Sequence, residues 1–415
     1  MERRVVVTGL GVLSCVGNDV ETFWNSVVEG KSGISLIKSF DTENFSVKIG
    51  GEVRNFNPED YGISRKETKR MDKFLQYASS ASYMALNDSA LDLSAEDSYR
   101  IGVIIGSGIG GMGTFESQHT ALLEQGPSRV SPFFIPMMIS NMASGSVAIR
   151  FGLKGPNYSI VSACATGCHS IAESYYTIRR GDADVMVTGG TEASVTPIAV
   201  AGFANMKATA SNFNDCPEKA SRPFDLNRSG FVMSEGCGIL ILEEYGHAVA
   251  RGAKIYGEIV GCGMTADAYH ITCTAPDGSG AAAAMRMAIG HAGITTADVD
   301  YINAHGTSTP VGDKAETAGI KSVFGDRAYD LLVSSSKSVF GHNLGAAGAL
   351  ESIVCLLALR DGIVPPTANY ETPDPECDLN YVPNVAVKRD IRYAVNNSFG
   401  FGGQNAVLVF KKYEN

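Results

Sequence analysis

The sequence repeats one pattern of strand and helix signals in its two halves. Apolar runs rich in β-branched residues lie at 4–8, 101–105, 184–188 and 239–242, and stretches with helical periodicity separate them. After about Ala253 the pattern begins again, with apolar runs at 255–260, 299–303, 331–334, 393–397 and 406–411. Strands that alternate with helices predict an α/β fold. We therefore expect two similar halves, at residues 1–253 and 254–415.

Two helix-like segments strengthen the evidence for duplication. Residues 165–181 begin with small side chains and end in RRG, and residues 345–362 begin in the same way and end in LRDG. Small residues allow two helices to approach closely in a buried layer, and a final glycine fits a helix C-cap. No linker or low-complexity tract divides the chain of 415 residues, so we expect one large unit with two lobes.

A cysteine, two histidines and a lysine lie in turns of small residues that follow these apolar runs. Cys164 stands in VSACATG, His305 in AHGTST, His342 in FGHNLG and Lys337 in SSSKSVFGH. A cysteine alone is more often a buried core residue than a nucleophile. A tight turn at a helix N-terminus would expose its sulfur where the helix dipole favours the thiolate. The four residues together predict a nucleophilic site for carbon–carbon chemistry.

With VVVTGLG at 5–11, FDLNRSGF at 224–231 and NSFGFGGQN at 397–405, the chain resembles the condensing enzymes of the thiolase superfamily. It is most similar to elongating β-ketoacyl-acyl-carrier-protein synthases of type II, nearly from end to end. The resemblance implies a five-layered αβαβα fold built from two duplicated halves. It also implies a decarboxylative Claisen condensation of an acyl-enzyme thioester with malonyl-acyl-carrier protein, which gives 3-oxoacyl-acyl-carrier protein in type II fatty-acid elongation.

The same resemblance implies roles for the residues of the predicted site. Cys164 is expected to carry the acyl group, and the backbone N–H groups of Cys164 and Phe401 to stabilise the oxyanion. His305 and His342 are expected to be neutral imidazoles whose N–H groups stabilise the enolate. Lys337 and Glu351 are expected to form a charge pair that fixes the tautomer of His342.

Substrate and carrier-protein contacts follow from the resemblance as well. Apolar side chains near the sulfur are expected to set the acyl length, with the aromatic gate Phe401 protecting the thioester from water. The residues expected to bind substrate are Ile109, Phe203, Thr272, Thr307, Thr309 and Phe399. The residues expected to bind the acidic acyl carrier protein are Arg65, Lys66, Lys69, Arg70, Arg129 and Lys207, although such a run is equally typical of a solvated helix face.

Composition limits the partners and the compartment. The formal net charge of −10 argues against general nucleic-acid binding. Nine cysteines without a C-x-x-C motif favour reduced thiols in the cytoplasm. The chain has no apolar run long enough to cross a membrane, and Gly9 and Gly11 interrupt a start that superficially imitates a signal peptide. We expect a homodimer without a resident cofactor, because phosphopantetheine arrives on the carrier protein.

Other interpretations stay open at this point. Cys164, Cys168 and His169 could form a metal cluster, but helical geometry places His169 on another face. The GSGIGG motif at 106–111 fits a dinucleotide-binding turn, but prolines break the region that should supply a ribose-binding acid. A stand-alone ketosynthase of a polyketide or aryl-polyene pathway would use the same residues. A non-catalytic subunit that binds carrier protein is the alternative from another functional class.

Overall fold

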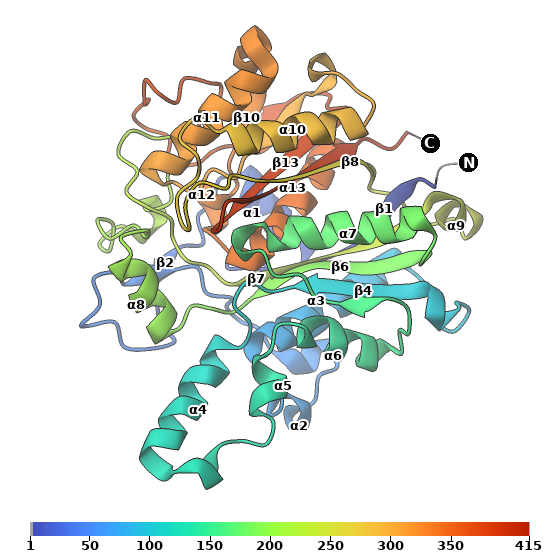
Figure 1. Ribbon diagram of the computed structural model, residues 1–415, viewed down its shortest axis with the longest axis vertical. Helices are drawn as coiled ribbons and strands as arrows, with labels where there is room; N and C mark the ends of the chain where they lie inside the picture. The colour runs from blue at the N-terminus through green and yellow to red at the C-terminus, as the bar shows by residue number, and fades with distance from the viewer. Residues whose placement is uncertain (1–2, 415) are drawn as a thin grey trace.

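The computed structural model describes residues 3–414, and its main sheet contains ten strands (Figure 1). They are β1 (Val5–Leu13), β4 (Ile101–Gly106), β5 (Asn157–Tyr158), β6 (Val185–Glu192), β7 (Gly236–Glu244), β8 (Gly257–Ala266), β9 (Tyr301–Asn303), β10 (Leu332–Ser334), β13 (Tyr393–Gly400) and β14 (Gln404–Lys411). Two small antiparallel ribbons pair β2 (Ser35–Leu36) with β3 (Ile49–Gly50) and β11 (Ile363–Val364) with β12 (Val387–Lys388). Every predicted apolar run overlaps a strand of the main sheet. The short, exposed β5 has no apolar run and was not predicted.

The helices are α1 (Val20–Val28), α2 (Arg65–Thr68), α3 (Lys73–Ser89), α4 (Met112–Gln125), α5 (Phe134–Met138), α6 (Met142–Phe151), α7 (Thr166–Arg180), α8 (Pro197–Asn205), α9 (Tyr245–Ala250), α10 (Ser279–His291), α11 (Pro310–Phe324), α12 (Lys337–Phe340) and α13 (Ala347–Asp361). Within residues 3–414, none of these helices combines the length and the hydropathy that a bilayer crossing requires.

The strand order is mirrored about the centre of the sheet. One side runs β1-β7-β6-β4-β5 and the other β8-β14-β13-β9-β10, so corresponding strands of the two halves take corresponding places. The halves join where β1 pairs antiparallel with β8, from Val5 opposite Ile259 to Val7 opposite Gly257. This order agrees with the predicted duplication, whereas the boundary between residues 253 and 254 stays a prediction.

Helices and sheet halves alternate in five layers, so the predicted α/β fold is confirmed (Figure 1). α7 and α13 lie between the two halves of the sheet, α3 and α6 cover one outer face, and α10 and α11 cover the other. The strands alternate accordingly: Val185 and Val187 face the outer cluster with α3, and Met186 faces the central one.

The central layer explains the small residues that mark both inner helices. A Cβ on Gly167 would lie 2.7 Å from the backbone N of Ala349, and a Cβ on Gly348 would lie 2.7 Å from Cys168 Sγ. Ala347–Leu359 of α13 are buried on every side. Gly181 and Gly362 end the two helices in the left-handed conformation, with φ of 82° and 64°, which confirms the predicted C-caps.

Candidate active site

Cys164 lies in a tight turn at the start of α7. The preceding Ala163 has a φ of 50°, in the left-handed region that non-glycine residues rarely adopt. The turn is held by Ser162, whose N–H donates to Thr166 Oγ1 at 2.8 Å. Cys164 is 8% exposed. The predicted strand-to-helix turn is therefore present, but the sulfur lies inside the protein.

The loop between β13 and β14 packs directly on this turn. A Cβ on Gly400 would lie 2.5 Å from the carbonyl O of Ser162 and 3.3 Å from the N of Cys164. Gly402 and Gly403 follow with φ of 84° and 71°. The backbone N–H of Phe401 lies near enough to the Cys164 thiol to lower its pKa. The glycines thus allow the close approach that the sequence predicts.

The electrostatics of the thiol differ from the sequence expectation. Burial raises the pKa of Cys164 to about 11, although the charge of Lys337 and the N–H of Phe401 lower it. Desolvation disfavours the thiolate more than the surrounding dipoles and charges favour it. In the free protein at neutral pH the sulfur is therefore a protonated thiol.

Two histidines face the sulfur from the other half of the molecule. His305 follows β9 and His342 follows α12, and their ring centroids lie 5.5 Å apart at 86°. Burial and the charge of Lys337 hold the pKa of both imidazoles well below the usual value. Both rings are neutral, as the sequence analysis expects, so each carries one N–H.

Lys337 and Glu351 form a buried ion pair beside these histidines, with side chains 1% and 0% exposed. Lys337 Nζ lies 3.5 Å from His305 Nδ1. Because an ammonium only donates, this contact makes Nδ1 the acceptor and leaves the proton of His305 on Nε2. The expectation that the pair fixes the tautomer of His342 is wrong in this respect, because the lysine contacts His305. The His342 ring packs edge-to-face with the Phe231 ring, with 5.3 Å between their centroids.

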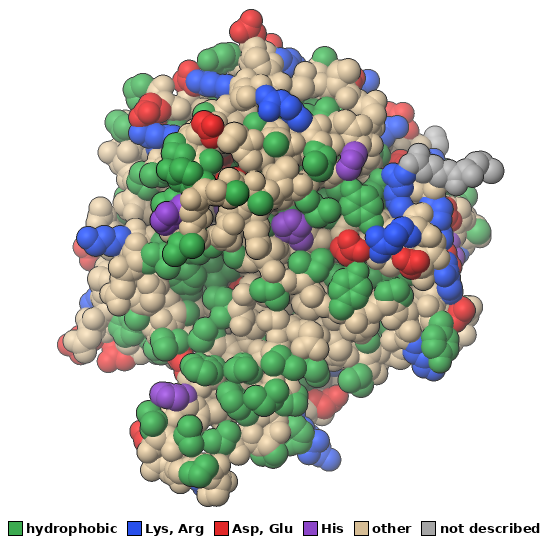
Figure 2. All heavy atoms as spheres, viewed as in Figure 1, with side chains coloured by type: hydrophobic (Ala, Val, Ile, Leu, Met, Phe, Trp, Pro, Cys, Tyr) green, Lys and Arg blue, Asp and Glu red, His purple; other side chains and the backbone are tan. Residues whose placement is uncertain are grey.

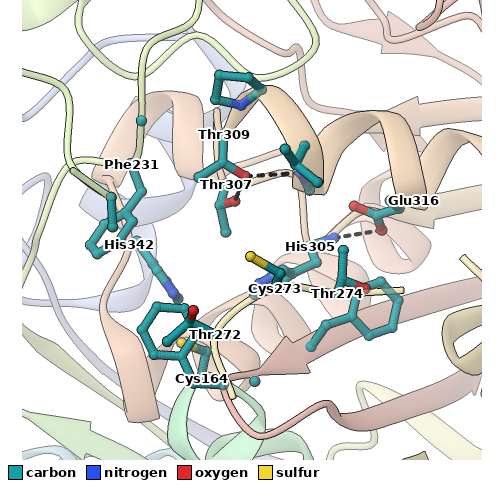
Figure 3. A pocket seen from close by; sticks show the side chains of 18 of the residues that line it. Cys164, Phe231, Thr272, Cys273, Thr274, His305, Thr307, Thr309, Glu316 and His342 are labelled. Carbon is teal, nitrogen blue, oxygen red and sulfur yellow. Dashed lines mark hydrogen bonds between the residues drawn. The ribbon is translucent and has the colours of Figure 1, made fainter. Parts of the chain in front are cut away.

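One cavity of about 400 Å³ joins most of the predicted site (Figure 3). Among its lining residues are Cys164, Lys207, Thr272, His305, Thr307, Thr309, His342, Phe399 and Phe401. Thr307 and Thr309 lie on the far side of the cavity from Cys164, with their hydroxyl oxygens 3.1 Å apart (Figure 3).

The two apolar residues expected to set acyl length lie beside this cavity rather than on its wall. Ile109 and Phe203 pack against a hydrophobic cluster that contains Cys164. The Phe203 ring centroid is 5.4 Å from that of Phe231 and 6.3 Å from that of Phe401. Both residues therefore adjoin the cluster that contains the sulfur, and Phe203 also lies near the expected gate.

The basic residues are not gathered at one place. Lys207 lines the cavity, whereas Arg65, Lys66, Lys69, Arg70 and Arg129 lie on or next to α2 and in the turn after α4. Arg65 pairs with Glu59 at 3.4 Å, and the guanidinium of Arg70 lies 4.6 Å from the centroid of the Phe133 ring.

Glu316 and Cys273 are among the cavity residues that the sequence analysis missed. Glu316 on α11 accepts hydrogen bonds from the N–H groups of His305 (2.9 Å) and Gly306 (2.7 Å), and so holds the histidine turn. The sequence feature that could have indicated Glu316 is a carboxylate on the buried face of an amphipathic helix. Cys273 brings a second, exposed thiol to the cavity between Thr272 and Thr274.

The residues considered for a metal cluster and for a dinucleotide-binding turn make contacts within the protein itself. His169 Nδ1 lies 2.8 Å from Ser162 Oγ, and Cys168 packs against the backbone of Gly348. The glycines at 106–111 form the turn after β4, and a carboxylate of the protein itself, Glu192, accepts the N–H of Gly108 at 2.8 Å.

Comparison with known proteins agrees with this geometry. Residues 2–248 match the family model of the β-ketoacyl synthase N-terminal domain, and residues 256–371 match that of the C-terminal domain. The 3-oxoacyl-[acyl-carrier-protein] synthase 2 of Staphylococcus aureus (strain COL) is 55% identical over 412 residues, which cover 99% of each chain. The protein of the same name from Vibrio harveyi is 52% identical over 412 residues, again 99% of each chain.

Solved structures are similar over the whole chain. One chain of a solved complex, described as a type II polyketide synthase acyl-carrier protein with its ketosynthase bound to the hexaketide, matches with a TM-score of 0.91 and 36% identity, over 100% of this chain and 100% of that chain. A β-ketoacyl synthase from Burkholderia phymatum STM815 matches with a TM-score of 0.91 and 33% identity, over 99% of this chain and 100% of the other.

Proposed function

Because the chain belongs to the β-ketoacyl synthase family, we propose that it catalyses the decarboxylative condensation of fatty-acid chain elongation at Cys164. The observation that carries the proposal is the meeting of Cys164, two neutral imidazoles and the N–H of Phe401 around one cavity. The relatives at 52–55% identity are named 3-oxoacyl-[acyl-carrier-protein] synthase 2, so a fatty-acid substrate is favoured over a polyketide.

In the first step an acyl group moves to the enzyme. The sulfur of Cys164 attacks the thioester carbonyl of the acyl carrier protein, a new C–S bond forms, and the bond to the pantetheine sulfur breaks. The proton of Cys164 ends on the departing pantetheine thiol. The N–H groups of Cys164 and Phe401 stabilise the oxyanion, since the N–H of Phe401 already lowers the pKa of this thiol and so favours negative charge there.

In the second step malonyl-carrier protein loses its carboxylate as CO₂, and negative charge grows on the thioester oxygen. His305 and His342 donate their N–H groups to that oxygen. Lys337 keeps both rings neutral through its charge and holds the His305 proton on Nε2. The buried site makes each of these hydrogen bonds stronger than in water.

In the third step the carbanion attacks the acyl-Cys164 carbonyl. A C–C bond forms, the C–S bond to Cys164 breaks, and the sulfur regains a proton from solvent. The 3-oxoacyl chain on the carrier protein is then two carbons longer. Ile109 and Phe203 limit the acyl tail, and Thr272, Thr307 and Thr309 bind the pantetheine arm along the cavity.

The assembly we propose is a homodimer. Figure 2 shows hydrophobic side chains gathered over the lobe that contains α4 and α5. The exposed ones are Phe115, Leu122, Leu123, Phe133, Ile135 and Ile139, and β5 lies at the edge of the sheet. Exposed apolar area and an open sheet edge are each typical of an interface between copies. Nine free cysteines support a cytoplasmic location, where thiols stay reduced.

The decisive experiment follows acyl groups by intact mass. The protein is incubated with acyl-carrier proteins of increasing chain length, then with malonyl-carrier protein, and the products are analysed. We expect adducts on Cys164 that disappear as 3-oxoacyl products two carbons longer are formed.

The matched control is Cys164→Ala, which should form no adduct, while Cys273→Ala, which removes the other thiol of the cavity, should still form it. Adducts on Cys273 alone would contradict the proposal. No adduct with any fatty acyl chain would point to a polyketide substrate or to a non-catalytic carrier-binding subunit.

A further inference from the structure

The turn that carries Cys164 has a counterpart in the other half of the molecule. Ala163 and Leu344, 181 positions apart, both adopt left-handed φ, at 50° and 47°. Each begins a short 3₁₀ turn that leads into an inner helix, and Gly345 takes the position that corresponds to Cys164. The N–H of Gly345 therefore lies at a helix start equivalent to the one that presents the N–H of Cys164.

This second N–H donates a hydrogen bond to a carboxylate of the protein, Glu192. Glu192 is the last residue of β6 and is 0% exposed. Its Oε2 accepts the N–H groups of Gly345 (3.0 Å) and Gly108 (2.8 Å). Its Oε1 accepts the hydroxyls of Ser107 (2.9 Å) and Ser194 (3.2 Å) and the N–H of Ile109 (3.3 Å).

Two glycines pack closely against this carboxylate. A Cβ on Gly345 would lie 2.8 Å from Glu192 Oε2 and 2.4 Å from the N of Gly108. A Cβ on Gly108 would also lie 2.8 Å from that oxygen. The two segments approach this closely because both are glycine, and the shared carboxylate oxygen links them.

These segments flank the reacting sulfur. Ile109, one residue after Gly108, packs on the cluster that contains Cys164. Gly345 lies three residues after His342 in the same turn. One side chain thus ties the wall of the acyl site to the segment that carries a catalytic histidine. We propose, on the basis of the proposed function, that Glu192 is a positioning residue that fixes Ser107–Ile109 and Leu344–Gly345 on either side of Cys164.

The hydrogen-bond pattern explains why an amide is a poor substitute. The groups that contact Oε2 are backbone N–H groups, which can only donate. The side chain of a glutamine must therefore keep its oxygen at the Oε2 position and place its NH₂ group at the Oε1 position. The hydroxyls of Ser107 and Ser194 can rotate to accept there, but the N–H of Ile109 then faces another donor. Glu192→Gln should therefore loosen mainly the segment Ser107–Ile109, while most of the fold is kept.

The test compares Glu192→Gln with Glu235→Gln. Glu235 is 2% exposed, and one of its oxygens accepts both the Tyr77 hydroxyl (3.0 Å) and the N–H of Val53 (2.9 Å), so an amide keeps both contacts. For Glu192→Gln we expect acylation of Cys164 to slow by about tenfold or more and preference among acyl lengths to weaken. Glu235→Gln should match the parent protein in both.

A second readout needs no acyl substrate. Burial is the main cause that raises the pKa of Cys164, and the charge of Glu192 adds to it. Removing this charge should move the pH profile of Cys164 alkylation by iodoacetamide to lower pH, whereas Ser194→Ala, which keeps the carboxylate, lacks this charge effect. If the parent protein makes no acyl adduct, the proposed function fails, and this profile still tests Glu192.

The outcomes are distinct. Unchanged acyl-length preference and an unchanged alkylation profile in Glu192→Gln would overturn the proposal, as would equal effects in Glu235→Gln. If Glu192→Gln does not fold, Ser194→Ala removes one donor and leaves the carboxylate in place. Smaller shifts of acyl-length preference in that variant support the proposal, and the parent preference refutes it.

Discussion

At the scale of single residues, the buried pair of Lys337 and Glu351 decides the chemistry of the site. A lone ammonium in this layer would be very costly, and Glu351 on α13 compensates it. The remaining field of Lys337 acts on its neighbours: with burial it lowers the pKa of both histidines, and it opposes the raised pKa of Cys164. One ion pair therefore keeps the imidazoles neutral for donation to the enolate.

Removal of Lys337 should cost both stability and decarboxylation. Lys337→Ala leaves the carboxylate of Glu351 buried and unpaired, so we expect a loss of about 3–5 kcal/mol in the free energy of unfolding. Loss of the contact to His305 Nδ1 should also slow release of CO₂ from malonyl-carrier protein. Denaturant unfolding and a CO₂-release assay measure the two effects.

A double variant separates these effects. Lys337→Met combined with Glu351→Gln removes both charges at similar volume, so stability should largely return while decarboxylation stays slow. Recovery of decarboxylation in the double variant would refute the role of Lys337.

The motifs predicted Cys164, His305, His342 and Lys337 because each stands in a small-residue turn after an apolar run, and the structure brings these four residues together. The contact of Lys337 with His305 could not be read from the sequence, since Lys337 is only five residues from His342 but 32 from His305. The protonated state of the free thiol was also missed. Its cause is burial of the sulfur among segments that are far apart in sequence, such as those that carry His305 and Phe401.

At the scale of elements, the loop between β13 and β14 acts as one wall of the thiol site. Its close fit predicts that Gly400→Ala impairs acylation, because the new Cβ would lie 2.5 Å from the carbonyl of Ser162 and the loop must shift away from Cys164. Gly290→Ala is the control, since that Cβ in α10 meets nothing within 4 Å. The control should keep its activity and gain up to about 1 kcal/mol of stability.

The measurement is the rate of acyl-adduct formation beside a thermal unfolding curve. Gly400→Ala should slow the adduct while the unfolding transition stays cooperative. An acylation rate equal to that of the parent would show that the loop tolerates displacement.

A second element-scale prediction concerns pH and the attachment of α9. His247 contacts Glu243 through Nδ1 (2.9 Å) and Glu96 through Nε2 (3.0 Å). Burial lowers the pKa of His247, but these hydrogen bonds outweigh it and the pKa is raised from 6.5. A raised histidine pKa gives stability that is complete below the unfolded value and is lost as pH rises through the folded value.

His247→Ala should therefore cost more stability at about pH 5.5 than at about pH 8.5, by less than ~1 kcal/mol because the group is partly exposed. Denaturant unfolding at both pH values tests this, with the exposed His119→Ala as the matched variant. If His247→Ala cost more stability at the higher pH, the pKa of His247 would not be raised in the folded protein.

The elements themselves were largely predictable. Apolar runs located the strands of the main sheet except β5, and small residues with a final glycine located α7 and α13. The sequence did not predict the role of Glu192, the carboxylate at the end of β6. Glu192 ends β6 as an ordinary polar residue in the sequence, and its five donors come from three separate segments that only the fold brings together.

At the scale of the whole molecule, charge opposes the expected partner. The chain carries a formal net charge of −10, and an acidic carrier protein would be repelled unless local cations guide it. Lys207 is the basic residue of the predicted carrier set that lines the cavity. The cations on or next to α2 do not line the cavity, so Lys207 is the residue of this set at which the effect of a local charge can be tested.

Reversal of the charge at the rim should therefore weaken carrier recognition without altering the chemistry. For Lys207→Glu we expect the KM for acyl-carrier protein to rise severalfold and to depend less on salt, because rim charges act mainly on the rate of encounter. The rate with a short acyl-pantetheine thioester, which has no carrier, should stay near that of the parent. Lys388→Glu makes the same change on the exposed β12, outside the lining of the cavity. An equal rise of KM in both variants would mean that net charge alone governs the encounter, whereas a rise confined to Lys207→Glu would place the docking of the carrier at this rim.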